Sequence, residues 1–304
     1  MTTRSAVVIN PSKVDDLEGR RRAIGAELER AGWPAPLWYE TTEDDPGCGQ
    51  AKSAVEAGAK VLFVCGGDGT VLAALDAVAG TDVALCVLPS GTGNLLARNL
   101  GLPDDVVAGV RLATEGGRRR IDLGVADGRR FAVMAGMGLD GRMIADTDHR
   151  AKSRFGWPAY ALALLRHLRD EPIAVEVVVD GGEVVRRHVQ SIVVGNVGRL
   201  QGGIALLPEA EPDDAQLDVA LVCACGIRQW MGLVVAVLRG RRRPHRYETL
   251  RGRRIQIVSD RPQPREIDGD LLEDSCRLTV DVMPAALLLC VSKAGERGDL
   301  EKAA

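Results

Sequence analysis

Residues 61–70 read VLFVCGGDGT, and this stretch is the most informative part of the sequence. The apolar run at its start predicts a buried β-strand, and the spacing of apolar residues from Val71 onward predicts a helix. The glycines between them allow a sharp turn and a close backbone approach, and amides at a helix N-terminus favour phosphate. A strand, turn and helix without any ligand would have the same pattern. The candidate polyphosphate-binding residues are Gly66, Gly67, Asp68, Gly69 and Thr70.

A second stretch, residues 88–94 (LPSGTGN), repeats this order of a strand, a glycine turn and a helix-like segment. Its hydroxyl and amide side chains suit contact with a nucleotide. Neither stretch is a Walker A loop, which requires Gly-Lys-Ser/Thr, or a Rossmann Gly-x-Gly-x-x-Gly turn. The candidate nucleotide-binding residues here are Gly91, Thr92 and Asn94.

The first part of the chain alternates short apolar runs with helix-like segments. The predicted strands lie at residues 6–9, 37–39, 61–65 and 83–88. The predicted helices lie at residues 15–31, 50–57 and 71–78, with another beginning at Pro103-Asp104. This alternation is typical of an α/β domain with a parallel sheet.

From about Ile121 the sequence changes to short strands joined by turn dipeptides such as Asp127-Gly128 and Asp268-Gly269, which predicts a β-rich second part. One helical segment, at residues 157–168, interrupts it. We expect a first domain at residues 1–121 and a second at residues 122–304, with the last segment returning to the first domain.

The composition is that of a folded globular protein, because hydrophobic residues make up 46% and charged residues 27% of the 304-residue chain.

The net charge of −3 provides no general attraction to nucleic acid, and the basic run at residues 239–246 is local, so no nucleic-acid partner is expected. Seven scattered cysteines without a Cys-x-x-Cys pair indicate a reducing compartment rather than disulfides or zinc.

Two apolar segments could suggest a membrane or a secretion signal. The one at the N-terminus is too short for a signal peptide. The other, residues 230–238, falls well below the roughly 18 apolar residues that a spanning helix needs. We therefore expect a cytoplasmic protein that is associated with the membrane only peripherally. The basic run at residues 239–246 would suit a solvated loop, and a basic cluster would also favour anionic lipid.

The GGDGT string resembles the superfamily of lipid kinases and NAD kinases. Residues 88–98 are similar to the Pro-x-Gly-Thr-x-Asn segment of diacylglycerol and sphingosine kinase catalytic domains. An NAD kinase would have a different glycine segment and a downstream Asn-Glu pair, and the sequence has neither. Asn10-Pro11, Thr41-Thr42 and residues 135–140 extend the resemblance to nearly the whole chain. One departure is Leu95, where many members have aspartate.

The resemblance implies a diacylglycerol kinase-like and NAD kinase-like α/β domain followed by a sandwich-like β domain. It also implies an ATP-dependent lipid kinase that transfers the γ-phosphate to the hydroxyl of diacylglycerol or a related lipid alcohol. Asn10 and Thr42 would approach the nucleotide, and catalytic Mg²⁺ would arrive with ATP. An NAD kinase-like enzyme and a catalytically weak nucleotide- or lipid-binding regulatory protein stay as alternatives.

The β-rich part contains PDDAQLD at residues 212–218, which resembles the family's Asp-Asp-Gly-x-Leu-Asp segment with Ala215 in place of the glycine. The resemblance implies a structural Mg²⁺ held by the carboxylate of Asp214 and the carbonyl oxygens of Glu211 and Gln216. Oxygen ligands of this kind suit a hard cation.

Residues 266–270 (EIDGD) resemble the family's Asp-Gly-Glu motif, with the final acid shortened to Asp270. The Asp-Gly pair alone would also predict an ordinary hairpin turn. Two carboxylates are candidates for the general base, namely Asp68 and Asp270. We favour Asp270 acting across an interdomain cleft, with Asp68 holding Mg·ATP and orienting the hydroxyl.

The lipid site is predicted in the β-rich part, where Phe155, Trp157 and Tyr160 stand close in sequence to Lys152 and Arg154. Aromatic and basic residues together suit a membrane interface, although aromatic residues also pack in cores. The residues do not distinguish diacylglycerol from a sphingoid base or a polyprenol. The resemblance implies that an exposed edge strand can pair two subunits, so a homodimer is the assembly considered.

Overall fold

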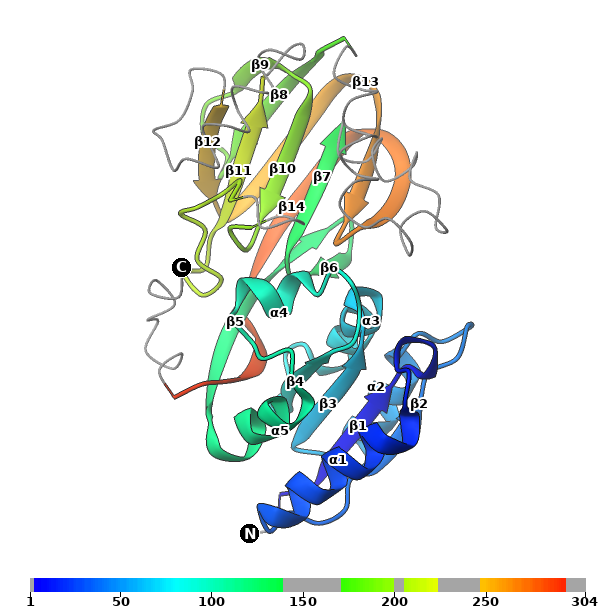
Figure 1. The fold of residues 1–304 in the computed structure, drawn as a ribbon. Helices are drawn as coiled ribbons and strands as arrows, with labels where there is room; N and C mark the ends of the chain where they lie inside the picture. The colour runs from blue at the N-terminus through cyan, green and yellow to red at the C-terminus, as the bar shows by residue number, and fades with distance from the viewer. Residues whose placement is uncertain (1–2, 139–170, 200–204, 224–246, 294–304) are drawn as a thin grey trace. The chain divides into compact units, whose positions relative to one another are not determined.

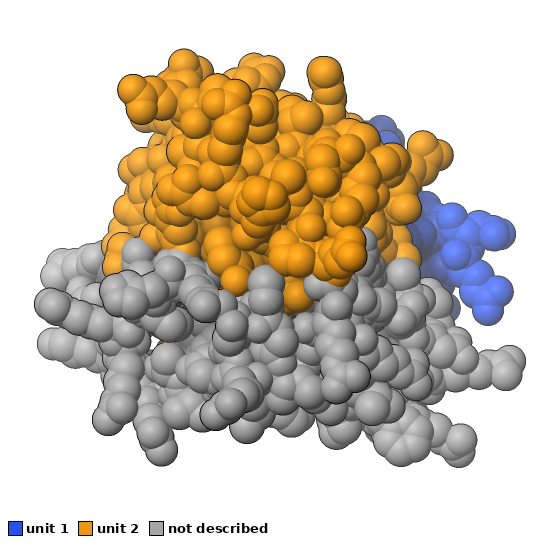
Figure 2. Space-filling view, turned by 90° about the horizontal axis from the view of Figure 1, so that it is seen from above, with its two compact units in different colours: residues 1–121, 285–304 blue, residues 122–284 orange. Residues whose placement is uncertain are grey.

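The computed structural model describes residues 3–138, 171–199, 205–223 and 247–293. The chain divides into two compact units, which Figure 2 colours separately. Unit 1 consists of residues 1–121 and 285–304, and unit 2 of residues 122–284. Two long strands, β5 (Gly117–Ala126) and β14 (Asp270–Val291), carry the chain from one unit to the other (Figure 1).

Unit 1 is built on a parallel sheet with the strand order β14-β4-β3-β1-β2. The strands that lie entirely in it are β1 (Ser5–Ile9), β2 (Leu37–Glu40), β3 (Val61–Gly66) and β4 (Ala84–Pro89). The chain returns through β14, whose Leu289 pairs with Leu85 of β4. The α/β domain with a parallel sheet that the sequence predicts is confirmed.

The helices of unit 1 follow the strands in alternation. They are α1 (Leu17–Arg30), α2 (Cys48–Glu56), α3 (Asp68–Val78), α4 (Leu95–Asn99), α5 (Val106–Glu115) and the 3-10 helix η1 (Pro11–Lys13). Asp16 caps α1 by accepting a hydrogen bond from the backbone N–H of Gly19 at 2.8 Å, and Asp105 caps α5 through Ala108 at 2.8 Å. Such caps satisfy amides that the first helical turn leaves unpaired.

The core of unit 1 lies between these helices and the sheet. All residues of β1, β3 and β4 are buried, as expected for a parallel sheet covered on both faces. Phe63 of β3 packs in one cluster with Ile24 and Leu28 of α1. This burial fixes the carboxyl ends of the strands, where the two glycine turns begin.

Unit 2 is antiparallel, with the strand order β12-β11-β10-β7-β13-β14, and β8 pairs with both β13 and β9. The strands not yet given are β6 (Arg129–Phe131), β7 (Met134–Gly138), β8 (Ile173–Val179), β9 (Val185–Val189), β10 (Ser191–Gly195), β11 (Leu217–Val222), β12 (Tyr247–Gly252) and β13 (Arg254–Ile267). The prediction of a β-rich second part is confirmed.

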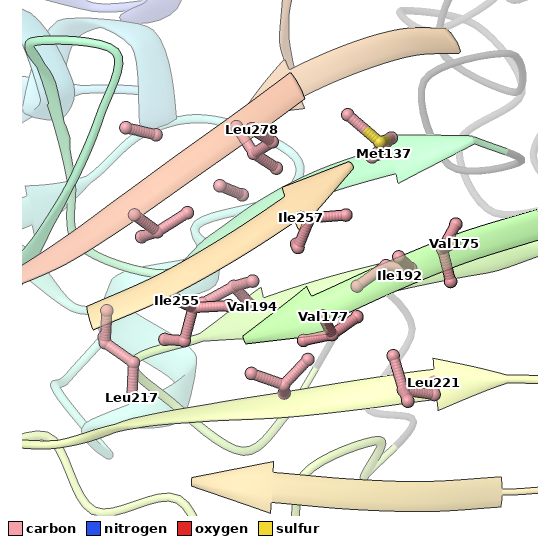
Figure 3. Close-up of a cluster of buried hydrophobic side chains, with 14 of the residues drawn as sticks. Met137, Val175, Val177, Ile192, Val194, Leu217, Leu221, Ile255, Ile257 and Leu278 are labelled. Atoms are coloured by element: carbon pink, nitrogen blue, oxygen red, sulfur yellow. The ribbon is translucent and has the colours of Figure 1, made fainter. Parts of the chain in front are cut away.

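One face of these strands forms the core of unit 2 (Figure 3). Met137, Val175, Ile192 and Leu221 come from four different strands and belong to one buried cluster. Alternate residues are buried at the start of both β8 and β13, which is the pattern of a sheet with one apolar face.

The predicted turn dipeptides are hairpin turns. Asp127-Gly128 joins β5 to β6, and Asp268-Gly269 joins β13 to β14. Both residues of each pair have positive φ, at 49° and 82° in the first turn and 46° and 91° in the second. Two-residue turns of this left-handed kind match the twist of the strands that they connect.

Several sequence predictions lie outside the described residues. They concern the helix at 157–168, the aromatic and basic residues proposed for the lipid site, and the basic run at 239–246. In the part of the chain that the structure describes, no helix is long and apolar enough to cross a membrane.

Candidate functional site

The first glycine turn follows β3 directly, and α3 begins at Asp68. A side chain at Gly66 would meet the side chain of Thr70, with its Cβ 2.6 Å from the Cβ of Thr70. Thr70 itself is buried. Glycine is therefore required at position 66 by the packing of the turn against the first turn of the helix.

The second glycine turn lies against the first. A Cβ at Gly91 would stand only 2.7 Å from the Cα of Gly67, so the two backbones touch without room for a side chain at that position. The backbone N–H of Ser90 donates to the carbonyl oxygen of Gly66 at 2.9 Å. The two predicted motifs thus form one surface at the carboxyl ends of two neighbouring parallel strands, where ligands of α/β sheets commonly bind.

Asn94 shapes the second turn. Its Oδ1 accepts a hydrogen bond from the N–H of Gly91 at 3.1 Å, and its Nδ2 donates to the carbonyl oxygen of Gly91 at 2.8 Å. Asn94 has φ of +48°, in the left-handed region that asparagine tolerates better than most residues. Thr92, also in this turn, is exposed. The side chain of Asn94 is thus engaged within the turn, and the hydroxyl-bearing Thr92 faces solvent.

Asp68 ties the two turns together. Its Oδ1 accepts a hydrogen bond from the backbone N–H of Leu95 at 2.6 Å. Burial raises the pKa of Asp68, and hydrogen bonds from the backbone of Leu95 and Asn94 oppose part of that rise. Leu95, the position where many relatives have aspartate, contributes its backbone to this bond and buries its side chain.

Asn10 and Thr42 lie after the ends of β1 and β2. The Nδ2 of Asn10 donates to the Oγ1 of Thr70 at 3.2 Å, which connects the end of β1 to the first helical turn of α3. The Oγ1 of Thr42 accepts a hydrogen bond from the N–H of Asp45 at 3.1 Å within its own loop. The structure therefore brings Asn10 directly to the glycine turns and uses Thr42 to order the loop before α2.

The chemistry of this surface is that of an anion site. The backbone amides of the first turn of α3 have no partners within the helix, and they carry the positive end of the helix dipole. Asn10, Thr70 and Thr92 add polar side chains. The half-buried carboxylate of Asp68 would supply negative charge to a cation bound there.

In unit 2, Asp268 and Asp270 flank Gly269 at the β13–β14 hairpin. The carboxylate of Asp268 accepts hydrogen bonds from the backbone N–H groups of Ala132, Val133 and Met134 at 2.8, 3.0 and 2.8 Å. Sequence reasoning did not find this role for Asp268. The bonds fasten the hairpin to the segment between β6 and β7.

Asp270 is the first residue of β14, and its side chain is 57% exposed. Its Oδ2 lies 3.6 Å from an Nη2 of Arg129 in β6. An exposed pair at this distance contributes little to stability, but it holds a positive charge beside the carboxylate. Asp270 is therefore an accessible carboxylate on a firmly anchored turn.

The acidic loop, residues 209–218, contains the three residues that the resemblance implies as ligands of a structural metal. The Oδ1 of Asp214 accepts a hydrogen bond from the N–H of Gln216 at 2.9 Å. Ala215, which replaces a family glycine, has φ of +59°, and its N–H donates to Asp122 at 2.6 Å. A left-handed backbone explains why the resembling sequences have glycine at that position.

A basic residue that the sequence patterns did not indicate as part of a site also contacts this loop. Arg251 of β12 forms ion pairs with Asp214 and Asp218, and it donates to the carbonyl oxygen of Glu209. The sequence shows only that Arg251 lies in a strand-like run. Its contact with Asp218 could not be predicted, because that contact depends on the register between β11 and β12. In the described ranges, no group of three or more His, Cys, Asp or Glu side chains is arranged to hold a metal ion.

Two known domain families match the chain. The diacylglycerol kinase catalytic domain matches residues 4–126, and the YegS C-terminal NAD kinase beta sandwich-like domain matches residues 132–291. A probable YegS-like lipid kinase from Pseudomonas syringae pv. tomato is 30% identical over 226 residues, which cover 74% of this chain and 73% of that protein. The chain belongs to the family of diacylglycerol kinase-like, YegS-like lipid kinases, and the predicted family resemblance is confirmed.

Two further comparisons agree with this assignment. A diacylglycerol kinase from Mycobacterium tuberculosis is 31% identical over 195 residues, which cover 62% of this chain and 63% of that protein, so the match spans less than two thirds of its length. The crystal structure of a putative diacylglycerol kinase from Bacillus anthracis superposes with a TM-score of 0.80 at 22% identity, covering 96% of both chains. The predicted fold class, an α/β domain followed by a sandwich-like β domain, is confirmed.

Proposed function

We propose that this chain is an ATP-dependent lipid kinase, which transfers the γ-phosphate of ATP to the hydroxyl of diacylglycerol or a related lipid alcohol. The observation that carries the proposal is the contact between Gly67 and Gly91, where a Cβ would come within 2.7 Å of the facing backbone. Two glycine-rich turns at the ends of β3 and β4 allow a ligand rich in negative charge to approach the backbone amides closely. A polyphosphate carries such negative charge.

The proposal assigns the nucleotide to unit 1. The glycine turns hold the phosphates through backbone N–H groups, and Asn10, Thr70 and Thr92 add side-chain contacts. Thr42 borders the nucleotide through its ordered loop. Asn94 acts indirectly, because both ends of its amide are bonded to Gly91 and keep the turn in shape.

Phosphoryl transfer requires in-line positioning, neutralisation of charge and a group that accepts the proton of the attacking hydroxyl. We assign proton acceptance to Asp270, because its carboxylate is accessible and stands on an anchored turn. Asp68 is already bonded to the N–H of Leu95, which suits a residue that orients Mg·ATP. Asp68 would hold Mg²⁺ that enters with ATP, and the ion would reduce the negative charge of the phosphates.

The assignment of the lipid as acceptor rests on the family, because relatives named as lipid kinases align with 74% of the chain. A water-insoluble substrate requires contact with a lipid surface, so we propose peripheral membrane association in the cytoplasm. The homodimer considered above stays a prediction.

The test is γ-phosphate transfer from ATP in the presence of Mg²⁺, with NAD and detergent-dispersed diacylglycerol, sphingoid base and polyprenol offered side by side. We expect a phosphorylated lipid with the wild type and a loss of about 100-fold or more in kcat with Asp270→Ala. Asp274→Ala is the matched control, because Asp274 is an exposed carboxylate on the same strand. It is expected to retain wild-type activity.

Other outcomes would contradict the proposed function or the proposed base. Phosphorylated NAD would indicate an NAD kinase-like enzyme, and ATP binding without transfer to any acceptor would indicate a regulatory protein. Retention of full activity in Asp270→Ala together with its loss in Asp68→Asn would move the role of base to Asp68.

A further inference from the structure

The acidic loop contains two carboxylates that are largely removed from solvent. The side chain of Asp214 is 18% exposed and that of Asp218 is 9% exposed. Ionised carboxylates at such burial require a positive partner, because the loss of hydration is otherwise uncompensated. The loop therefore needs a cation, either bound from solution or supplied by the chain.

Arg251 supplies that cation from the neighbouring strand. Its Nε lies 3.2 Å from both carboxylate oxygens of Asp218, and an Nη1 lies 3.5 Å from Oδ2 of Asp214. Its Nη2 donates to the carbonyl oxygen of Glu209. The guanidinium thus contacts two carboxylates and one backbone carbonyl, which are the oxygen types that a hard divalent ion would use as ligands.

Other polar groups of the loop are also bonded within the protein. The second oxygen of Asp214 accepts the N–H of Gln216, and Asp122 accepts the N–H of Ala215. The N–H of Asp122 donates in turn to the carbonyl oxygen of Pro212 at 2.6 Å. These bonds fix the loop against β5 on one side, and Arg251 fixes it against β12 on the other.

We propose that Arg251 takes the place of a structural divalent cation in the acidic loop, so that the folding of unit 2 does not depend on bound Mg²⁺. A metal at Asp214 would face the positive charge of the guanidinium at short range. Mg²⁺ also requires a nearly octahedral oxygen shell, and one carboxylate oxygen of Asp214 is already engaged by Gln216 and the other by Arg251. The ligand set implied by the family resemblance therefore fits this chain poorly.

The proposal is independent of the kinase reaction, so its test contains no ATP and measures no activity. Thermal unfolding of the full chain is followed with EDTA, with MgCl₂ and with CaCl₂ at millimolar concentrations. For the wild type we expect the unfolding midpoint to change by less than about 1 °C among these conditions, because a site without metal affinity provides no linkage between binding and folding.

The decisive variant is Arg251→Met, which keeps much of the length of the side chain and removes its charge. In EDTA its midpoint is expected to fall by about 4 °C or more, since two largely buried carboxylates lose their partner. Mg²⁺ or Ca²⁺ is then expected to restore part of the loss, because the carboxylates become available. The matched control is Arg187→Met, which removes an exposed ion pair with Glu248 and should show no response to metal.

Two results would overturn the proposal. One is a wild type whose midpoint falls by several degrees in EDTA and recovers in Mg²⁺, which would show that a metal supports the loop despite Arg251. The other is an Arg251→Met variant that gains no stability from either ion. The wild-type measurement decides the question even if the variant does not fold.

Discussion

The carboxylate of Asp268 accepts the backbone N–H of Met134 at 2.8 Å, and through this bond and two like it the β13–β14 hairpin is fastened to the start of β7. Asp270 stands two residues further along the same hairpin. A carboxylate that must meet a hydroxyl in a defined geometry needs such support from the residues around it. Asp268 is therefore a positioning residue for Asp270 in the proposed reaction.

Asp268→Ala should lose both stability and catalysis. Three N–H groups lose a charged acceptor, so we expect the free energy of unfolding to fall by about 3 kcal/mol. The kcat for lipid phosphorylation should fall at least about tenfold, with KM for ATP unchanged, because the hairpin no longer holds Asp270 in place. Urea unfolding and steady-state kinetics measure the two effects.

A matched variant separates positioning from general destabilisation. Asp180 also begins an Asp-Gly pair with positive φ, in the connection between β8 and β9, and its Oδ1 accepts the N–H groups of Arg253 and Arg254 at 2.9 and 2.8 Å. Asp180→Ala should lower stability by about 2 kcal/mol and leave kcat unchanged at a temperature where the protein is folded. Equal losses of kcat in both variants would contradict the positioning role.

Asp68→Asn should be more stable and less active than the wild type at neutral pH. Burial raises the pKa of Asp68, so the ionised carboxylate is less favourable in the folded chain than in the unfolded chain. The wild type therefore gains stability as pH falls through that raised pKa, and it loses this contribution as pH rises. The neutral amide has no such titration and can still accept the N–H of Leu95.

The measurement is the unfolding midpoint of both proteins between pH 7.5 and pH 4, without nucleotide. We expect the advantage of Asp68→Asn to be largest at pH 7.5 and to shrink as pH falls and the wild-type carboxylate becomes protonated. Activity should fall by about 100-fold or more, because the carboxylate that we propose to orient Mg·ATP is lost. A difference in midpoint that does not vary with pH would contradict the burial argument.

Two glycine variants distinguish the needs of folding from those of ATP binding. Gly91→Ala places a Cβ 2.7 Å from the Cα of Gly67, so it should lower stability by about 1–3 kcal/mol and disrupt the proposed nucleotide site as well. At Gly69 a Cβ would meet nothing within 4 Å, and the residue lies in α3. Gly69→Ala should leave stability unchanged or raise it by up to about 1 kcal/mol.

The two variants are compared by thermal unfolding and by ATP titration calorimetry. If the turn lies against phosphate, Gly69→Ala should weaken ATP binding about tenfold or more while the fold is intact, because the added methyl group enters the space of the ligand. Wild-type ATP affinity in Gly69→Ala would show that this part of the turn does not approach the nucleotide.

Ala215→Gly should stabilise the protein by about 1 kcal/mol. A residue with a Cβ at φ of +59° is strained by about 1–2 kcal/mol, and glycine removes that strain at some cost in chain entropy. Ala210→Gly is the control, because Ala210 is not among the described residues with positive φ and the same substitution there should destabilise by roughly 0.5–1 kcal/mol. Chemical unfolding of the three proteins, with midpoints compared at equal slope, tests this.

Much of the surface formed by the two glycine turns could be predicted because its signals are local. Around both Gly67 and Gly91, the apolar run, the glycine turn and the helix follow one another in consecutive residues, so each pattern can be recognised locally. The parallel sheet then brings the two turns together at one edge. The Asp-Gly hairpins were predictable for the same reason, since positive φ at Asp268 and Gly269 follows from residue type.

The sequence by itself determined the class of fold, the family and the presence of two glycine turns, because backbone preferences and hydrophobic periodicity act over a few neighbouring residues. Only the tertiary structure decided that Arg251 meets Asp214 and Asp218, and that Asp268 holds the N–H groups of residues 132–134. These contacts join residues that are far apart in the chain. They depend on strand register, and a shift of a single residue would turn each side chain to the opposite face of the sheet.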